Sequence, residues 1–304
     1  MSGRELDAAG ITDPALRASY EICRRLNAAH GKTYYLATLL LPPAKRPYVH
    51  ALYGFARYAD EIVDDLASTL TDAEKADWLI GWGERFLKEV EAGGSDHPVS
   101  RAVVDTVRRW DIPLRLFEDF LTSMRMDLTV TDYPTYEDLM VYVWGSAAVI
   151  GLQMLPVLEP TVPREIAEPY ATDLGTAFQL SNFIRDVGED LRRGRVYLPG
   201  EDLALFGVDR ERLARGVVDA PIRRLLAFEI ARTRELYRSA APGVRLLDPT
   251  SRDCMLTAIR LYGGILDEVE RADYQVLDRR VSVGAGRRIR VAVPGLARAY
   301  AARR

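Results

Sequence analysis

Hydrophobic positions recur at helical spacing along nearly the whole chain, whereas the strict alternation typical of strands is rare. Thr71 followed by Glu74 is typical of a capping box, and glycines and prolines stand where other helices would stop. Strand-like patterns occur only at 195–199 and at 281–293, where a hairpin around Gly284 is possible. The pattern predicts an all-α fold in a single domain over residues 1–304, with helices at about 14–29, 44–67, 72–91, 99–110, 114–127, 135–155, 163–192, 219–240, 251–278 and 287–302.

One stretch is apolar enough to raise the question of a membrane span. Residues Leu139–Leu158 carry no charge and have about the length that crosses a bilayer. The stretch also contains Gln153 and Pro156, and no basic cluster flanks it. We therefore expect a helix buried at the centre of a soluble bundle.

Composition narrows the class of protein. The 304 residues include 41 basic and 44 acidic side chains, a net charge of -3, so we expect no nucleic-acid partner. The two cysteines, Cys23 and Cys254, are too few for a disulfide framework, and the N-terminus has no apolar signal region, which indicates a cytoplasmic protein. The three histidines are far apart, which disfavours a zinc or di-iron site.

Two predicted helices carry a polar stripe where a core face is expected. In the first, Tyr53, Arg57, Asp60 and Asp64 share one face. In the second, the same face holds Gly175, Gln179, Asn182, Asp186 and Asp190. Each helix has a separate apolar stripe that can pack normally.

Each stripe ends in two aspartates four residues apart, an arrangement that destabilises an isolated helix by about 0.2–0.5 kcal/mol. A solvated acidic face is one explanation. The other is a cation site, because oxygen ligands without nearby histidine or cysteine favour Mg²⁺ or Mn²⁺. Magnesium commonly joins one or two carboxylates to phosphate oxygens, and several arginines lie near both stripes. Beside an apolar wall, such a pair of stripes is typical of a prenyl diphosphate site.

The motifs themselves resemble those of the phytoene/squalene synthase family of head-to-head prenyl synthases. D-E-I-V-D at 60–64 is similar to the family's first aspartate-rich motif, although Glu61 stands where many members have aspartate. Q-L-S-N-F-I-R-D-V-G-E-D-L-R-R-G-R-V-Y-L-P at 179–199 is similar to the second. The likeness extends to H-G-K-T-Y-Y at 30–35, L-Y-G-F-A-R at 52–57, Y-V-W-G-S-A-A at 142–148 and Y-G-G-I-L-D-E-V at 262–269.

The resemblance implies a helical bundle around a central cavity and Mg²⁺-dependent condensation of two identical prenyl diphosphates. It implies metal binding by Asp60, Asp64, Asp186 and Asp190. It implies contact with the diphosphate or leaving group by Tyr53, Arg57, Arg185, Tyr197 and Tyr262. It places His30, Lys32, Thr33, Tyr142, Gln179 and Asn182 at the substrate. Tyr142 and Tyr262 could instead be ordinary core residues, and His30 could simply end a helix before Gly31.

The sequence of residues 30–65 most resembles those of bacterial phytoene synthases. These enzymes join two geranylgeranyl diphosphates through a cyclopropyl diphosphate and use no NADPH. An enzyme that makes presqualene diphosphate, dehydrosqualene or squalene from farnesyl diphosphate is the alternative. From another class, a catalytically silent helical scaffold would explain the fold but not the aspartate stripes. The sequence leaves prenyl chain length and oligomeric state open.

The C-terminal segment is strongly basic. Eight arginines and no acidic residue lie between Arg279 and Arg304. A solvated, partly disordered tail is one interpretation. A salt-sensitive peripheral contact with acidic membranes is the other.

Overall fold

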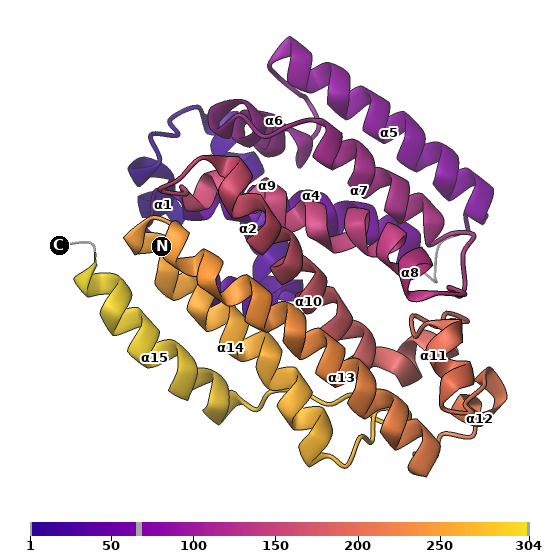
Figure 1. Ribbon diagram of the computed structural model, residues 1–304. Helices are drawn as coiled ribbons and strands as arrows, with labels where there is room; N and C mark the ends of the chain where they lie inside the picture. Colours follow the sequence, from indigo (N-terminus) through magenta and orange to yellow (C-terminus); the bar gives the residue numbers. More distant parts are fainter. Residues whose placement is uncertain (1, 65–68, 303–304) are drawn as a thin grey trace.

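The computed structural model describes residues 2–64 and 69–302, and these residues are helical almost throughout (Figure 1). The predicted all-α fold is confirmed, and the long helices lie close to the predicted ranges. The elements are α1 (Ser2–Ala8), α2 (Pro14–His30), α3 (Lys32–Thr38), α4 (Arg46–Asp64), α5 (Asp72–Ala92), α6 (Ser100–Trp110), α7 (Arg115–Met126), α8 (Tyr136–Val143), η1 (Trp144–Ala148), α9 (Val149–Leu158), α10 (Arg164–Arg192), α11 (Gly200–Leu205), α12 (Arg210–Ala214), α13 (Ala220–Ala240), η2 (Ala241–Leu246), α14 (Pro249–Arg271) and α15 (Ala285–Ala301).

The ends of several helices follow the local chemistry of the sequence. The predicted capping box is present at the start of α5: the Glu74 amide donates to the Thr71 hydroxyl, and the Thr71 amide donates to the Glu74 carboxylate. Helix α5 ends at Gly93, which adopts the left-handed conformation that favours glycine. Asp13, Asp219 and Asp248 accept amide hydrogen bonds at the starts of α2, α13 and α14.

The structure decides between two predictions at the C-terminus. The helix predicted at 287–302 is confirmed and the hairpin at 281–293 is wrong, because α15 begins at Ala285 and runs to Ala301. Its small residues Ala292 and Ala299 are buried, so an amphipathic helix takes the place of paired strands. Pro294 lies inside this helix rather than ending it. No strand forms at 195–199 either; among the described residues the one β-bridge joins Pro160 to Leu247.

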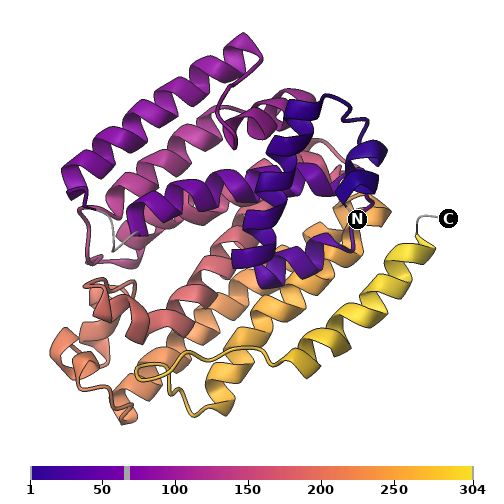
Figure 2. The ribbon, with the colours of Figure 1, turned by 180° about the vertical axis from the view of Figure 1, so that it is seen from behind.

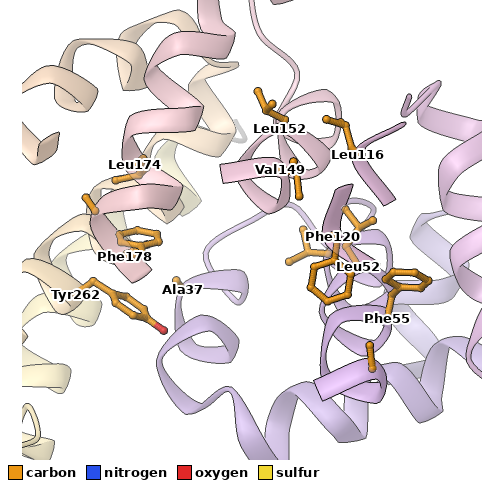
Figure 3. Packing of buried hydrophobic residues seen from close by; sticks show 14 of the residues in the cluster. Ala37, Leu52, Phe55, Leu116, Phe120, Val149, Leu152, Leu174, Phe178 and Tyr262 are labelled. Carbon is orange, nitrogen blue, oxygen red and sulfur yellow. The ribbon is translucent and has the colours of Figure 1, made fainter. Parts of the chain in front are cut away.

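Two long helices organise the bundle. Helix α4 packs against α2, α6, α7 and α9, and helix α10 packs against α9, α13 and α14. Phe55 of α4 anchors an aromatic core, with the rings of Trp82, Phe86, Phe117 and Phe120 within 5.7 Å of its own. Figure 3 shows Phe55 and Phe120 beside Leu52, and Phe178 and Tyr262 on the other side, toward Ala37. Closely packed side chains therefore border the space between α4 and α10.

The uncharged stretch expected at the centre of the bundle runs through α8, η1 and α9. Residues Tyr136–Leu158 are the one described segment long and apolar enough to cross a membrane, and 72% of its apolar window is buried inside the fold. Glycine is required on this stretch, because a Cβ at Gly151 would lie 2.4 Å from the Ala171 carbonyl oxygen of α10. On α10, a Cβ at Gly175 would lie 2.6 Å from the Ala147 carbonyl oxygen. These two glycines let the stretch pack directly against α10.

Candidate active site

A cavity of about 220 Å³ lies between α3, α4, α9, α10 and α14. Its walls are mainly apolar; Met154, Leu158, Leu174, Phe178 and Met255 are among the side chains that line it. On α4 the lining includes Val49, Tyr53 and Ala56, and the next turn of that helix brings Asp60. On α10 the lining runs from Ala167 to Gln179, and the following turns bring Asn182, Asp186 and Asp190. Each polar stripe thus continues an apolar cavity wall toward the C-terminal end of its helix.

Four aromatic rings from four helices meet at the end of the cavity nearest the stripes. The ring of Tyr34 on α3 lies 4.8 Å from that of Tyr262, 6.1 Å from that of Phe178 and 6.2 Å from that of Tyr53. The Phe178 and Tyr262 rings are 4.5 Å apart (Figure 3). Burial raises the pKa of Tyr53 to about 12, and burial also raises the pKa values of Tyr34 and Tyr262. All three phenols are therefore protonated at neutral pH and can donate hydrogen bonds.

Arg57 contacts the first acidic motif, residues 60–64 of α4. Its Nη1 donates to Asp60 at 2.5 Å, and its Nε donates to Glu61 at 3.1 Å. The Nε2 of His30, the last residue of α2, lies 3.5 Å from Glu61 Oε1. The charges of Arg57, Asp60 and Glu61 all act on the Tyr53 phenol. Asp64 ends α4, and its side chain lies outside the described part of the structure.

The second acidic motif lies on the last turns of α10. Asp186 accepts hydrogen bonds from its neighbour Arg185 at 2.8 Å and from Arg280, whose Nε lies 2.9 Å from Oδ1. Arg185 also lies close enough to Tyr34 and Tyr262 for its charge to lower their pKa values against the effect of burial. Burial, together with the charges of Asp186 and Glu189, raises the pKa of Asp190 to about 7. Burial and the two neighbouring carboxylates therefore outweigh the charges of Arg193 and Arg195, which lower the pKa of Asp190.

The donor set fits a hard cation held jointly with a substrate. Among the described residues, no three carboxylate, histidine or cysteine side chains stand close enough to bind a metal ion by themselves. Magnesium needs no such cluster, because one or two carboxylates, water and phosphate oxygens satisfy its coordination. Asp190 is half-buried, and desolvation followed by the charges of Asp186 and Glu189 raises its pKa, so a bound cation would favour its ionised form.

Two of the predicted site tyrosines lie in a different place. Tyr142 and Tyr197 do not line the cavity; both hydroxyls donate to the Asp127 carboxylate, at 2.7 and 2.8 Å. Tyr197 stacks on Phe183 with ring centroids 4.2 Å apart. Tyr197, Asp190 and Arg195 line one small pocket, so this group borders the second acidic motif. Its roles stay predictions.

The other predicted substrate residues fall into two groups. Gln179 lines the cavity, and Asn182 lies half-buried on the next turn of α10. Lys32 is exposed and Thr33 half-buried at the start of α3, outside the cavity lining. Tyr34 and Phe178, which make most of the ring contacts at the cavity end, were not among the candidates. Tyr34 stands inside the H-G-K-T-Y-Y motif, which was the available signal.

Comparison with known proteins agrees with this architecture. The squalene/phytoene synthase family model matches residues 27–287. A phytoene synthase from Arthrospira platensis is 40% identical over 89% of this chain and 90% of its own length. A 15-cis-phytoene synthase from Synechocystis sp. is 39% identical over 88% of this chain and 82% of its own.

Solved structures support the same fold. A dehydrosqualene synthase superimposes with a TM-score of 0.85 at 26% identity, covering 94% of this chain and 98% of that one. A squalene synthase from Alicyclobacillus acidocaldarius superimposes with a TM-score of 0.76 at 27% identity, covering 88% and 98%. The fold and site define an isoprenoid-condensing helical bundle, and the chain belongs to the squalene/phytoene synthase family.

Proposed function

We propose that the chain is a phytoene synthase, which joins two geranylgeranyl diphosphates head to head and releases phytoene for carotenoid biosynthesis. The observation that carries this is the convergence of two acidic helices on one aromatic-ended, apolar cavity. The relatives at 40% and 39% identity are named as phytoene synthases, which favours this product over the squalene-type alternative. The reaction needs no NADPH.

The charged ends of α4 and α10 would bind the diphosphate groups of the substrates. Arg57 and Arg185 already contact the acidic motifs, so each can turn one N–H toward a phosphate oxygen while keeping its carboxylate partner. Asp60, Asp64, Asp186 and Asp190 would hold Mg²⁺, or Mn²⁺ in its place. When bound, the metal supplies positive charge to the diphosphate as the allylic C–O bond breaks.

The cavity protects the carbocation that this bond breaking leaves. Its walls exclude water, which would otherwise capture the cation as an alcohol. The faces of Tyr34, Tyr53, Phe178 and Tyr262 meet next to the charged end, where the cation forms. Attraction between a desolvated cation and an aromatic face is worth up to about 2 kcal/mol. The Tyr53 and Tyr262 hydroxyls, kept protonated by burial, can donate to the departing diphosphate.

Thermal unfolding separates this function from a silent scaffold. A Mg²⁺ and inorganic pyrophosphate mixture should raise the melting temperature beyond either component alone, because each ligand completes the other's site. Asp186→Asn should abolish the joint effect, while Glu165→Gln, at the start of α10 and outside the site, should preserve it. A scaffold would show no cooperative shift in melting temperature.

We also propose that the protein acts in the cytoplasm, in peripheral contact with acidic membranes.

A further inference from the structure

Three buried tyrosines form a layer beside the second acidic motif. Tyr133 lies between α7 and α8, Tyr142 lies on α8 and Tyr197 follows α10; each is 8% exposed or less. The ring of Tyr197 lies 5.5 Å from that of Tyr142 and 6.1 Å from that of Tyr133. Figures 1 and 2 show the segment after α10, with α11 and α12, at one edge of the bundle. We call these three residues the tyrosine layer.

Asp127, the residue that follows α7, accepts hydrogen bonds from two hydroxyls of the tyrosine layer. Tyr142 donates to Oδ2 at 2.7 Å, and Tyr197 donates to Oδ1 at 2.8 Å. Each oxygen of the carboxylate therefore holds one tyrosine. Burial, followed by the charge of Asp127, raises the pKa values of both phenols, so both stay protonated and remain donors at neutral pH.

The main chain near Asp127 holds the segment that follows the second acidic motif. Arg195 Nη2 donates to the Asp127 carbonyl oxygen at 3.0 Å. The Val196 amide donates to the Thr131 carbonyl oxygen at 2.8 Å. Residues 195–197 are therefore attached to the end of α7 by main-chain and side-chain hydrogen bonds together.

The attached segment reaches Asp190, an acidic residue of the second motif. The Arg195 amide donates to the Asp190 carbonyl oxygen at 2.9 Å, and the charge of Arg195 lowers the pKa of the Asp190 carboxyl against the larger effect of burial. Asp190, Arg195 and Tyr197 also line one small pocket. A displacement of Tyr197 would therefore change the position of Arg195 relative to a carboxylate that we propose binds metal.

We propose that Asp127 is a positioning residue for the diphosphate site. It holds Tyr142 and Tyr197 by their hydroxyls and Arg195 by its main chain, and so fixes the surroundings of Asp190 before substrate binds. Asp127 does not line the cavity, so it acts through these partners. The removal of groups that orient a metal-binding carboxylate commonly weakens metal affinity or activity by about 10–100-fold. The effect on ligand binding rests on the proposed function, whereas the attachment of residues 195–197 does not.

An attachment that only stabilises the fold is the competing explanation, and the chain offers a matched control for it. Tyr20 is 1% exposed, and its hydroxyl donates to the Asp105 carboxylate of α6 at 2.6 Å, outside both pockets. Asp105→Asn and Asp127→Asn each keep the size of the side chain but replace one acceptor oxygen by an amide nitrogen that only donates. The two variants therefore weaken the same kind of hydrogen bond at two places.

Hydrogen exchange of the ligand-free full chain tests the attachment. Asp127→Asn should raise amide exchange in residues 195–200 by about tenfold or more, because their hydrogen bonds open more often. Asp105→Asn should leave exchange in these residues unchanged. Unchanged exchange in Asp127→Asn would overturn the attachment. Circular dichroism and the melting temperature establish that each variant folds.

Titration calorimetry with pyrophosphate in excess Mg²⁺ tests the positioning, at a temperature where the variants are folded. Asp127→Asn should bind pyrophosphate about tenfold more weakly or worse than the wild type. Asp105→Asn should bind like the wild type even where its melting temperature falls as far. If Asp127→Asn does not fold, a variant with Tyr142→Phe and Tyr197→Phe replaces it, since this variant removes both donors and keeps the stacked rings.

The combination of Asp127→Asn with Tyr197→Phe shows whether Asp127 acts through its partner. Tyr197→Phe alone should also weaken pyrophosphate binding, and the combined variant should bind no more weakly than Asp127→Asn, because both changes remove one hydrogen bond. Losses that add, or binding by Asp127→Asn equal to that of the wild type, would overturn the positioning role. A wild type that binds no pyrophosphate would instead contradict the proposed function, and hydrogen exchange would then decide the attachment by itself.

Discussion

The Arg280 guanidinium forms a two-point contact with the Asp186 carboxylate, with Nε 2.9 Å from Oδ1 and Nη2 3.1 Å from Oδ2. Arg280 lies beyond the end of α14, in the segment that the sequence suggests as a basic tail. It also approaches Glu189 at 3.8 Å. Part of the basic C-terminal segment therefore compensates the second acidic motif rather than extending into solvent.

This contact predicts a stability effect that depends on metal. Arg280→Gln should lower the stability of the metal-free protein by less than about 1 kcal/mol, because the arginine is half exposed and solvent screens the pair. The loss should shrink when Mg²⁺ and pyrophosphate supply the missing charge balance. Thermal unfolding in chelator and in Mg²⁺ with pyrophosphate measures both, with Arg215→Gln as an exposed control. A loss of equal size under both conditions would contradict a shared charge balance.

Asp190→Asn should make the metal-free protein more stable and its turnover with Mg²⁺ slower. Its carboxyl has a pKa of about 7 because of burial and of the neighbouring Asp186 and Glu189 charges. Asp190→Asn removes that repulsion, so the melting temperature in chelator should rise while turnover with Mg²⁺ falls by orders of magnitude. Glu165→Gln serves as the control, expected to change neither. If the wild-type protein turned over substrate at an unchanged rate in excess chelator, a role for metal would be contradicted.

His50 should make the protein less stable as the pH falls. The ring is 1% exposed, its Nδ1 lies 3.0 Å from Asn27 Nδ2, and burial together with Arg24 and Arg46 lowers its pKa to about 3. The folded state therefore resists a proton that the unfolded chain accepts below its ordinary pKa of about 6.5. The full contribution of His50 to the free energy of unfolding should be present above that pH. It should decline as the pH falls toward the pKa of the folded state.

Between pH 7 and pH 5 this single group should cost about 2 kcal/mol of unfolding free energy. Urea unfolding at the two pH values measures the decline in the wild type and in His50→Gln. The variant is expected to be less stable overall but to lose about 2 kcal/mol less over that interval. Identical declines would show that His50 titrates normally in the fold.

The cavity end farthest from the acidic motifs should set the length of the prenyl chain. Ala167 lines that end, about 18 Å along α10 from Gln179. Ala167→Leu should reduce turnover of geranylgeranyl diphosphate relative to farnesyl diphosphate by roughly tenfold or more. The ratio of the two rates on one protein preparation is the readout, so a general loss of stability cancels. An unchanged ratio would place the length limit elsewhere.

The sequence predicts the long helices and the order of charged residues along α4 and α10, for a physical reason. The stripes of α4 and α10 are local in sequence: helical periodicity places Arg57 beside Asp60, and Arg185 and Asp186 are neighbours in the chain. What brings Tyr34, Tyr53, Phe178 and Tyr262 together is the packing of four separate helices, which no local pattern contains. Tyr34 was missed for that reason, although its motif was recognised.

The surroundings of Tyr142 have the same origin. Its position depends on how α8 packs, and its hydroxyl donates to Asp127, whereas its role in the site stays a prediction. Residues 281–293 alternate enough to suggest a hairpin, but Ala285–Ala301 form α15, which packs against α14.

The most direct test of the central claim is product identification from purified protein with Mg²⁺. The protein is incubated with geranylgeranyl diphosphate or farnesyl diphosphate, each with and without NADPH, and the hydrocarbons are analysed by chromatography and mass spectrometry. The account predicts phytoene from geranylgeranyl diphosphate at the same rate with and without NADPH, and no product in chelator. Exclusive use of farnesyl diphosphate, or a hydrocarbon that appears only with NADPH, would contradict it.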